Sequence, residues 1–143
     1  MPTLEACRRE IEGLHAFFVD WYDGVLDDDE FARMEAAIGE DFEMVVPTGA
    51  VRDRDAVLAM VREGYGKTTH EGFDIEIRAV ELVRDLGDAA LVRYEEWQLS
   101  GEEGDEREED GRVSTVLLRE ADGTPEGLEW LDLHETSIEG REG

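Results

Sequence analysis

The sequence predicts an α+β domain in which helices come first and strands follow. Near the N-terminus, apolar residues recur every three or four positions, which is the spacing of an amphipathic helix. From residue 73 onward, apolar and polar residues alternate, as in strands with one buried face. This segregation favours three helices packed on one side of a curved, mostly antiparallel sheet. We expect a single domain over residues 1–143, with its core at about 4–138.

Three helices are expected in the first half of the chain. A second, shorter helix begins at Asp28 or Asp29, whose carboxylates can cap free N–H groups, and a third covers 52–66 with Asp53 as its cap. The first helix carries a long apolar stripe, formed by Leu4, Cys7, Ile11, Leu14, Phe18, Trp21 and Val25.

Five strands are expected, and one of them carries a bulge. In the second strand, apolar residues occupy odd positions up to Ala79 and even positions from Val80, a change of phase that predicts a β-bulge near Ala79. The acidic stretch 100–112 is expected to be a hairpin loop, and the spacing of its carboxylates is poor for a metal site. The strands are expected at 41–46, 73–82, 89–99, 112–119 and 128–138.

The charge is strongly negative along the whole chain. There are 39 acidic and 14 basic residues, giving a formal net charge of −25. Such a chain repels itself at low ionic strength, whereas at 1 M salt the Debye length falls to about 3 Å and screens the repulsion. The composition is similar to that of proteins from salt-loving microbes and predicts unfolding as salt is removed. It also argues against nucleic acid and anionic membranes as partners, because both are bound through Lys and Arg.

Several further features point to a cytoplasmic protein. Cys7 is the single cysteine, so no internal disulfide can form. The N-terminal stretch is charged and interrupted, unlike a signal peptide, and no stretch approaches the roughly 18 apolar residues of a membrane span. The three histidines have no metal-ligand spacing, and no phosphate-binding glycine loop is present, so we expect neither metal nor cofactor.

Several motifs resemble those of the nuclear transport factor 2-like superfamily. Pro47 and Gly49 precede the third helix, "VRYEEWQ" occupies 92–98, "RVSTVLLRE" occupies 112–120, and the last strand carries W-x-x-x-H-E-T from Trp130. The resemblance covers about residues 4 to 138. That superfamily includes ketosteroid isomerases, SnoaL-type polyketide cyclases, kinase hub domains and many proteins of unassigned function.

The resemblance implies a cone-shaped α+β barrel with a pocket between helices and sheet, and commonly a homodimer. Ketosteroid isomerases carry a catalytic Asp immediately before the proline that follows the first strand. Here that position is Val46, which cannot abstract a proton. The resemblance therefore implies the fold rather than that isomerase reaction.

The pocket is predicted from the more apolar face of each late strand, since successive residues of a strand point to opposite faces. Taking this face as the inner one places four polar residues inside: Arg93, Glu95, Thr115 and Glu135. A buried charge is costly unless it is paired, so two carboxylates near Arg93 would form a polar patch in an apolar cavity. Glu135 is the first candidate. The inner set reads Leu91, Arg93, Glu95, Trp97, Leu99, Val113, Thr115, Leu117, Leu131, Leu133, Glu135 and Ser137.

The opposite assignment remains open, because the two faces of the strand at 112–119 are almost equally apolar. If the faces are exchanged, the pocket is formed by Tyr94, Glu96, Arg112, Ser114 and His134. In the preferred assignment His134 faces away from the pocket, beside a dimer surface. That surface would contain Tyr94, Val116, Leu118 and Trp130.

Residues outside the late strands complete the candidate pocket. Met44, Tyr65 and Trp21 are candidate lining residues, although core packing explains Trp21 better. His15 lies beside the apolar stripe of the first helix and is read as a half-buried structural histidine.

Three functional hypotheses follow. The first is a dimeric domain that binds an unidentified small molecule. The second is an isomerase, cyclase or hydrolase that uses Glu135 or Glu95 as a general base, with a pKa set by burial and by Arg93. The third is a structural dimer or hub domain that binds through the outer face of its sheet.

Overall fold

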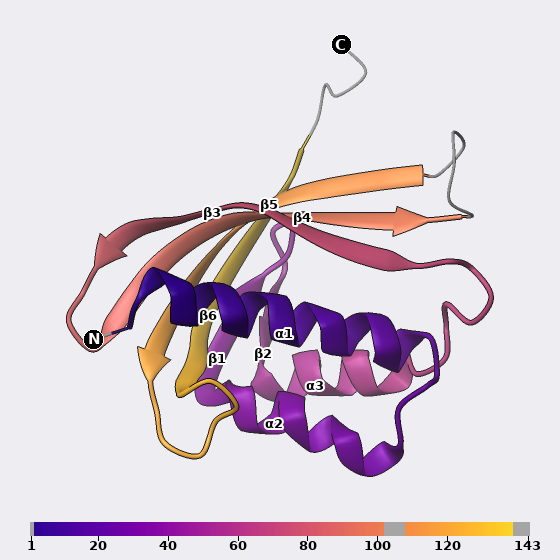
Figure 1. Cartoon of the computed structure of the whole chain (residues 1–143), viewed down its shortest axis with the longest axis horizontal. Coiled ribbons are helices and arrows are strands. Elements are labelled where there is room, and N and C mark those ends of the chain that lie inside the picture. The colour runs from indigo at the N-terminus through magenta and orange to yellow at the C-terminus, as the bar shows by residue number, and fades with distance from the viewer. Residues whose placement is uncertain (1, 102–107, 139–143) are drawn as a thin grey trace.

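The computed structural model describes residues 2–101 and 108–138. Its helices lie together on one face of a six-stranded sheet, and the strands bend around them (Figure 1). The α+β class and the packing of three helices on a curved sheet are therefore confirmed. The sheet does not close on itself, because β2 and β3 form its two edges.

The first helix, α1 (Leu4–Tyr22), runs across the inner face of the sheet (Figure 1). It begins at Thr3, whose hydroxyl accepts a hydrogen bond from the N–H of Ala6 at 3.0 Å. The predicted apolar stripe is the buried face, except that Val25 lies beyond the helix and is exposed.

The remaining helical segments are short. The 3₁₀ helix η1 (Asp28–Phe31) leads directly into α2 (Ala32–Ala37), so the predicted second helix is divided into two pieces. The third helix, α3 (Arg54–Glu63), begins after Asp53, whose carboxylate accepts from the N–H of Ala56 at 2.9 Å. This confirms Asp53 as the cap.

The sheet has the strand order β2-β1-β6-β5-β4-β3. The β1–β6 pair is parallel and the other pairs are antiparallel. This parallel pair brings the first long strand beside the last one, a pairing that alternation cannot predict. The strands are β1 (Ile38–Val45), β2 (Val51–Asp53), β3 (Asp74–Asp85), β4 (Ala89–Ser100), β5 (Glu108–Glu120) and β6 (Leu128–Ser137).

The strands differ from the prediction in several places. The short strand β2 was not predicted, and β3 continues to Asp85 rather than ending at 82. β1 begins at Ile38, because this residue already has extended backbone angles at the end of α2. β5 begins at Glu108, so the acidic loop is shorter than expected. Residues 102–107 of that loop lie outside the described residues.

Two irregularities set the direction of the strand side chains. Ala79 has a positive φ of 56°, and the β3–β4 register shifts between Arg78 and Glu81, which confirms the predicted bulge. A second shift lies between Leu117 and Leu118, which pair with Asp132 and Trp130 respectively. Because one extra residue of β6 lies at this point, the side-chain phase of that strand changes there.

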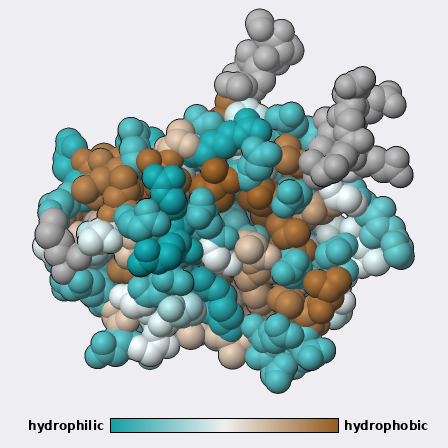
Figure 2. All heavy atoms as spheres, in the orientation of Figure 1, coloured by the Kyte–Doolittle hydropathy of each residue, from teal (hydrophilic) through white to brown (hydrophobic). Residues whose placement is uncertain are grey.

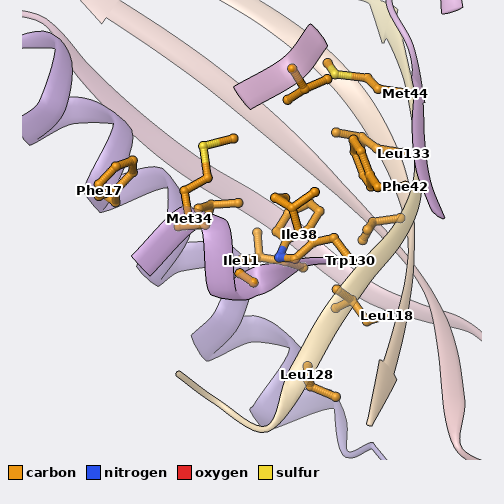
Figure 3. Packing of buried hydrophobic residues seen from close by; sticks show 14 of the residues in the cluster. Ile11, Phe17, Met34, Ile38, Phe42, Met44, Leu118, Leu128, Trp130 and Leu133 are labelled. Carbon is orange, nitrogen blue, oxygen red and sulfur yellow. The ribbon is translucent and has the colours of Figure 1, made fainter. Parts of the chain in front are cut away.

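The hydrophobic core fills the space between the helices and the inner face of the sheet. Figure 3 shows Met34 and Phe17 on the helical side facing Phe42, Trp130 and Leu133. From the late strands the core takes Ala90, Val92, Tyr94, Val116, Leu118, Leu128, Trp130 and Leu133, all buried.

The preferred assignment of the inner face is therefore wrong for β4 and β5. The apolar ring of Trp97 led to the prediction that the odd-numbered face of β4 faces the core. This ring lies on the outer face instead, where it is covered by Gly111 and by the guanidinium of Arg78, whose carbon lies 4.9 Å from the ring centroid. In β6 the assignment is right for Leu133 and Glu135 and wrong for Trp130. The extra residue lies between Trp130 and Asp132, so the inward-facing positions are even-numbered before it and odd-numbered after it. The proposed dimer surface of Tyr94, Val116, Leu118 and Trp130 is instead part of the core.

Hydrophilic side chains cover much of the face seen in Figure 2, with apolar residues in patches between them. Among the described residues, no helix has the length and apolar character needed to cross a lipid bilayer.

Candidate functional site

The main candidate site is a cavity of about 120 Å³ between the helices and the inner face of the sheet. Among its lining residues Met60 is 44% exposed, whereas most of the others are buried. The apolar wall consists of Leu14, Phe18, Met34, Ile38, Phe42, Met44, Val57, Met60, Val61, Ile75, Trp130 and Leu133. The polar end consists of His15, Tyr22, Glu96, Gln98, Arg112 and Glu135.

The first ion pair of the polar end joins α1 to β4. His15 Nε2 lies 3.1 Å from Glu96 Oε1, and both side chains are about 5% exposed. His15 Nδ1 lies 2.7 Å from the carbonyl oxygen of Ile11. Since both ring nitrogens face oxygen acceptors, each needs a proton, and the geometry favours the imidazolium.

The pKa values of this pair agree with the geometry. Burial alone would lower the pKa of His15, but the charge of Glu96 and the hydrogen bonds to Glu96 and Ile11 raise it above its usual value. Burial would raise the pKa of Glu96, but His15, a hydrogen bond from Gln98 and the charge of Arg112 lower it to about 2. Both pKa shifts therefore favour the ionised pair, as the geometry does.

The second ion pair joins β5 to β6. Arg112 Nη1 donates to Glu135 Oε1 at 3.0 Å, and Arg112 Nη2 lies 3.8 Å from Asp110 Oδ2. Burial and the charge of Glu96 raise the pKa of Glu135, although Arg112 opposes this. One arginine thus faces two carboxylates.

A row of polar side chains crosses three strands beside these pairs. Tyr94 pairs with Ser114 in register, and Ser114 pairs with Glu135, so the three side chains share the inner face. Tyr94 and Ser114 are fully buried, and their hydroxyls make no hydrogen bond of acceptable geometry with any described residue. Burial first, and then the charges of Glu96 and Glu135, raise the pKa of Tyr94 well above its usual range.

A separate buried network fastens α1 to α2 and β6. Glu10 is fully buried and accepts from Arg33 at 3.0 and 3.1 Å and from the indole N–H of Trp130 at 2.8 Å. These contacts occupy both carboxylate oxygens, so Glu10 has a structural role.

Two of the site residues predicted from sequence line the cavity, and these are Glu135 and Met44. Trp21 is buried in the core and donates from its indole N–H to the carbonyl of Val61 at 2.8 Å. Tyr65 is half exposed and donates its hydroxyl hydrogen to the carbonyl oxygens of Gly24 and Leu26.

The other predicted residues lie on the outer face of the sheet. Arg93 is exposed and lies 3.5 Å from Glu81, and Glu95 accepts from the indole N–H of Trp97 at 2.9 Å. Thr115 is half-buried and His134 is exposed. The alternative face assignment is correct for Glu96 and Arg112, which line the cavity. It is also correct for Tyr94 and Ser114, which lie on the inner face beside the polar end, and it is wrong for the exposed His134.

No site role was predicted from the sequence for His15 or Gln98. His15 is four residues after Ile11 and therefore shares its helix face, which was the available signal for a buried histidine. Gln98 follows Glu96 by two residues and so shares its strand face, where its amide donates to Glu96 at 2.8 Å.

Outside the cavity, a group of acidic side chains lies at the start of η1. Asp27, Asp29 and Glu30 bring carboxylate oxygens within 4.8 Å of one another, and all three are exposed. Asp27 and Glu30 form a reciprocal capping box, which accounts for their arrangement without an ion.

The fold is that of the nuclear transport factor 2-like class. An NTF-2 like protein of unknown function from Pseudomonas aeruginosa superposes with a TM-score of 0.79 at 33% identity, covering 93% of this chain and 98% of that one. ActVI-ORFA from Streptomyces coelicolor has a TM-score of 0.64 at 17% identity, covering 94% and 99%. The association domain of C. elegans CaMKII has a TM-score of 0.64 at 11% identity, covering 92% and 96%. The last two show likeness of fold alone.

Within this class, the chain belongs to the sucrose-6-phosphate phosphohydrolase C-terminal family, whose model matches residues 8–139. It is 26% identical to Sucrose-phosphatase 2 of Nicotiana tabacum over 136 residues and 25% identical to Sucrose-phosphatase 1 over 134 residues. Each match covers 92% of this chain, and the chain spans about 30% of the length of these curated relatives.

Proposed function

We propose that this chain is a small-molecule-binding domain whose ligand occupies the cavity between the helices and the sheet. The observation that carries the proposal is an apolar cavity with a single polar end, built from the His15–Glu96 and Arg112–Glu135 pairs. Binding pockets commonly combine apolar walls with a few convergent polar groups.

The cavity volume limits the size of the ligand. A cavity of about 150 Å³ in another protein holds one benzene molecule. At about 120 Å³, this cavity accommodates a single small ring or a short chain in its present form. The relatives are named sucrose-phosphatases. We therefore include sugars among the ligands to test, although a disaccharide would require the cavity to widen.

Thermal unfolding in the presence of small molecules tests the proposal. A ligand at ten times its Kd stabilises the folded state by about 1.4 kcal/mol, which corresponds to a rise in Tm of about 3–6 °C. Val57→Phe adds a ring to the cavity wall and should abolish the rise, whereas Val51→Phe on exposed β2 should preserve it. Equal responses from both variants would place the ligand elsewhere.

A second candidate is an enzyme that uses general acid/base chemistry at the same cavity. The observation that favours it is Glu135, which lines the cavity and whose pKa is raised by burial and by Glu96. Glu135→Gln should abolish turnover of any substrate that is found. Glu95→Gln serves as the matched control, because Glu95 lies on the outer face. Turnover unchanged by Glu135→Gln would remove the residue from the mechanism.

We further propose that the chain forms a homodimer through the outer face of its sheet. Leu91, Val113, Leu117 and Leu131 on this face are only half-buried in the single chain. Three of the similar solved structures are kinase association or hub domains. Sedimentation at high salt should give a dimer for the native chain and a monomer for Leu117→Asp. A native chain that sediments as a monomer at high protein concentration would contradict this.

A further inference from the structure

We propose that the cavity binds a small amine, with its ammonium group held by the carboxylate of Glu135 and its apolar body against the cavity walls. This inference rests on the proposed function, because it names the chemical class of ligand that the same cavity takes. Three features of the cavity support it: a carboxylate oxygen that is left free, charges that are unevenly shared, and walls that fit an apolar body.

The first feature is the second carboxylate oxygen of Glu135. The side chain is only 4% exposed, it lines the cavity, and its Oε1 accepts from Arg112 at 3.0 Å. Its Oε2 accepts no hydrogen bond from any described residue. The fully enclosed oxygens without a partner belong to Thr68, Tyr94 and Ser114, and Glu135 Oε2 is not among them, so its remaining surface faces the cavity. A largely buried carboxylate oxygen without a donor is destabilising, which favours a donor supplied by a ligand.

A second open acceptor lies on β4. Gln98 lines the cavity, and its amide nitrogen donates to Glu96 Oε2 at 2.8 Å. This leaves the amide oxygen of Gln98 without a donor among the described residues. Glu96 itself is occupied, since its Oε1 lies 3.1 Å from His15. An ammonium group has three donors and no acceptor, so it matches the two open oxygens.

The second feature is the sharing of charge at the polar end. Two cationic side chains lie close to three carboxylates, namely His15 and Arg112 to Glu96, Glu135 and Asp110. His15 lies 3.1 Å from Glu96. Arg112 is shared between Glu135 at 3.0 Å and the exposed Asp110 at 3.8 Å. Burial, and then the charge of Glu96, raise the pKa of Glu135, as expected for a carboxylate whose charge is only partly compensated. A cation at Oε2 completes the compensation, whereas an anion would have to displace Glu135 from Arg112.

The third feature is the rest of the cavity. Its walls beyond the polar end are aliphatic and aromatic, including Phe18, Phe42 and Trp130. A volume of about 120 Å³ accommodates a short alkyl chain or one small ring. The formal net charge of −25 also attracts cations and repels anions at low salt. Together these properties fit a primary amine with a short apolar body.

Four probes of equal size test the inference: n-butylammonium, n-butanol, n-butyl chloride and propionate. They have the same number of non-hydrogen atoms and differ in the group that would reach the polar end. Each is titrated into the isotope-labelled full chain at about pH 8, where an alkylammonium is charged. The buffer contains about 1 M NaCl, where the Debye length is about 3 Å and non-specific attraction to the acidic surface is screened. Amide shifts of Gln98, Arg112 and Glu135 report binding at the polar end.

The expected result is that n-butylammonium binds about tenfold more tightly than n-butanol, because it adds a charge–charge attraction to the hydrogen bond with Glu135. Propionate should bind most weakly. Either n-butanol or n-butyl chloride binding as tightly as n-butylammonium overturns the inference, and so does tighter binding of propionate, while a small-molecule cavity stays in place. If none of the four probes shifts the amides that line the cavity, the proposed function fails as well.

Two variants with the same change of net charge locate the ammonium group. Glu135→Gln keeps the shape of the side chain and leaves Arg112 an amide oxygen as acceptor, so n-butylammonium and n-butanol should then bind within about twofold of each other. Glu95→Gln is the matched control on the outer face of the sheet and should keep the native preference. If Glu135→Gln keeps the preference, or Glu95→Gln loses it, the inference is overturned, because the overall acidity of the chain then attracts the amine.

The native chain gives a direct readout that also decides the question if Glu135→Gln fails to fold. The side-chain carboxyl carbon of Glu135 should shift as n-butylammonium binds, and the carboxyl carbon of Glu95 should not. Binding that leaves the Glu135 carboxyl resonance unchanged contradicts the inference.

Discussion

The charges of the buried pair His15 and Glu96 should be coupled by about 3 kcal/mol in the folded protein. The pKa of Glu96 falls from 4.5 to about 2 in the folded state. One pKa unit corresponds to about 1.4 kcal/mol, so the folded protein favours the charged carboxylate by about 3 kcal/mol. This is a net value, in which His15, a hydrogen bond from Gln98 and the charge of Arg112 outweigh the effect of burial. Breaking one partner of a buried ion pair costs about 3–5 kcal/mol in other proteins, which agrees with this magnitude.

A double-mutant cycle measures this coupling. The native chain, His15→Gln, Glu96→Gln and the double variant are unfolded with urea at about pH 6 in high salt, where the raised pKa of His15 and the lowered pKa of Glu96 favour both charges. Each single variant leaves a buried charge unpaired, so the two losses should exceed the loss in the double variant by about 3 kcal/mol. The urea m-value should stay constant, since the surface exposed on unfolding does not change.

The exposed pair of Arg62 and Asp28 is the matched control. Its atoms are 2.8 Å apart, closer than those of the buried pair, but the two side chains are 45% and 86% exposed. Exposed pairs couple by less than about 1 kcal/mol. A His15–Glu96 coupling no larger than that of Arg62–Asp28 would refute the conclusion that burial, rather than distance, gives the pair its strength.

Three further predictions follow from charge, pH and packing. The pKa of His15 is higher in the folded protein than its usual value of 6.5. The resulting stabilisation is complete below pH 6.5 and is lost as the pH rises through the folded pKa. The native Tm should therefore fall between about pH 6 and about pH 9. His15→Gln should reduce this fall, and an identical pH profile would contradict the assignment. Lowering the salt from about 1 M to about 0.01 M lengthens the Debye distance from about 3 to about 30 Å and should lower the Tm, which calorimetry would detect; an unchanged Tm would refute salt adaptation. Gly111→Ala would place a methyl group 2.7 Å from the ring of Trp97 and should destabilise by about 1–3 kcal/mol in urea, with a smaller loss in a Trp97→Leu background.

The fold class could be predicted because it depends on local signals. The apolar stripe of α1, the capping carboxylate of Asp53 and the change of phase at Ala79 are each contained within a few residues of sequence. The parallel pairing of β1 with β6 could not be predicted, because it joins Ile38 to Trp130 across most of the chain. No local pattern records such a contact.

The inner face could not be predicted from the composition of each strand alone. In β6, one extra residue between the partners of Leu117 and Leu118 lets Trp130 and Leu133 face the helices together, although their positions have opposite parity. In β4, Trp97 is buried on the outer side by Gly111 and Arg78, so apolar character alone does not mark the core face. A strand face is therefore identified by its partners across the sheet as well as by its own composition.

The buried carboxylates of the candidate site were difficult to identify from the sequence for a related reason. With 39 acidic residues in the chain, the presence of a carboxylate says little about burial. The buried carboxylates of the described chain are Glu10, Glu96 and Glu135. Each is paired with a cationic side chain, and the partners are 23, 81 and 23 residues away in the sequence. Because a buried carboxylate needs such a partner, the scarce basic side chains carry more information than the abundant acids. In a chain this acidic, an arginine or histidine on a strand or helix face that is otherwise apolar marks the position where a carboxylate is buried.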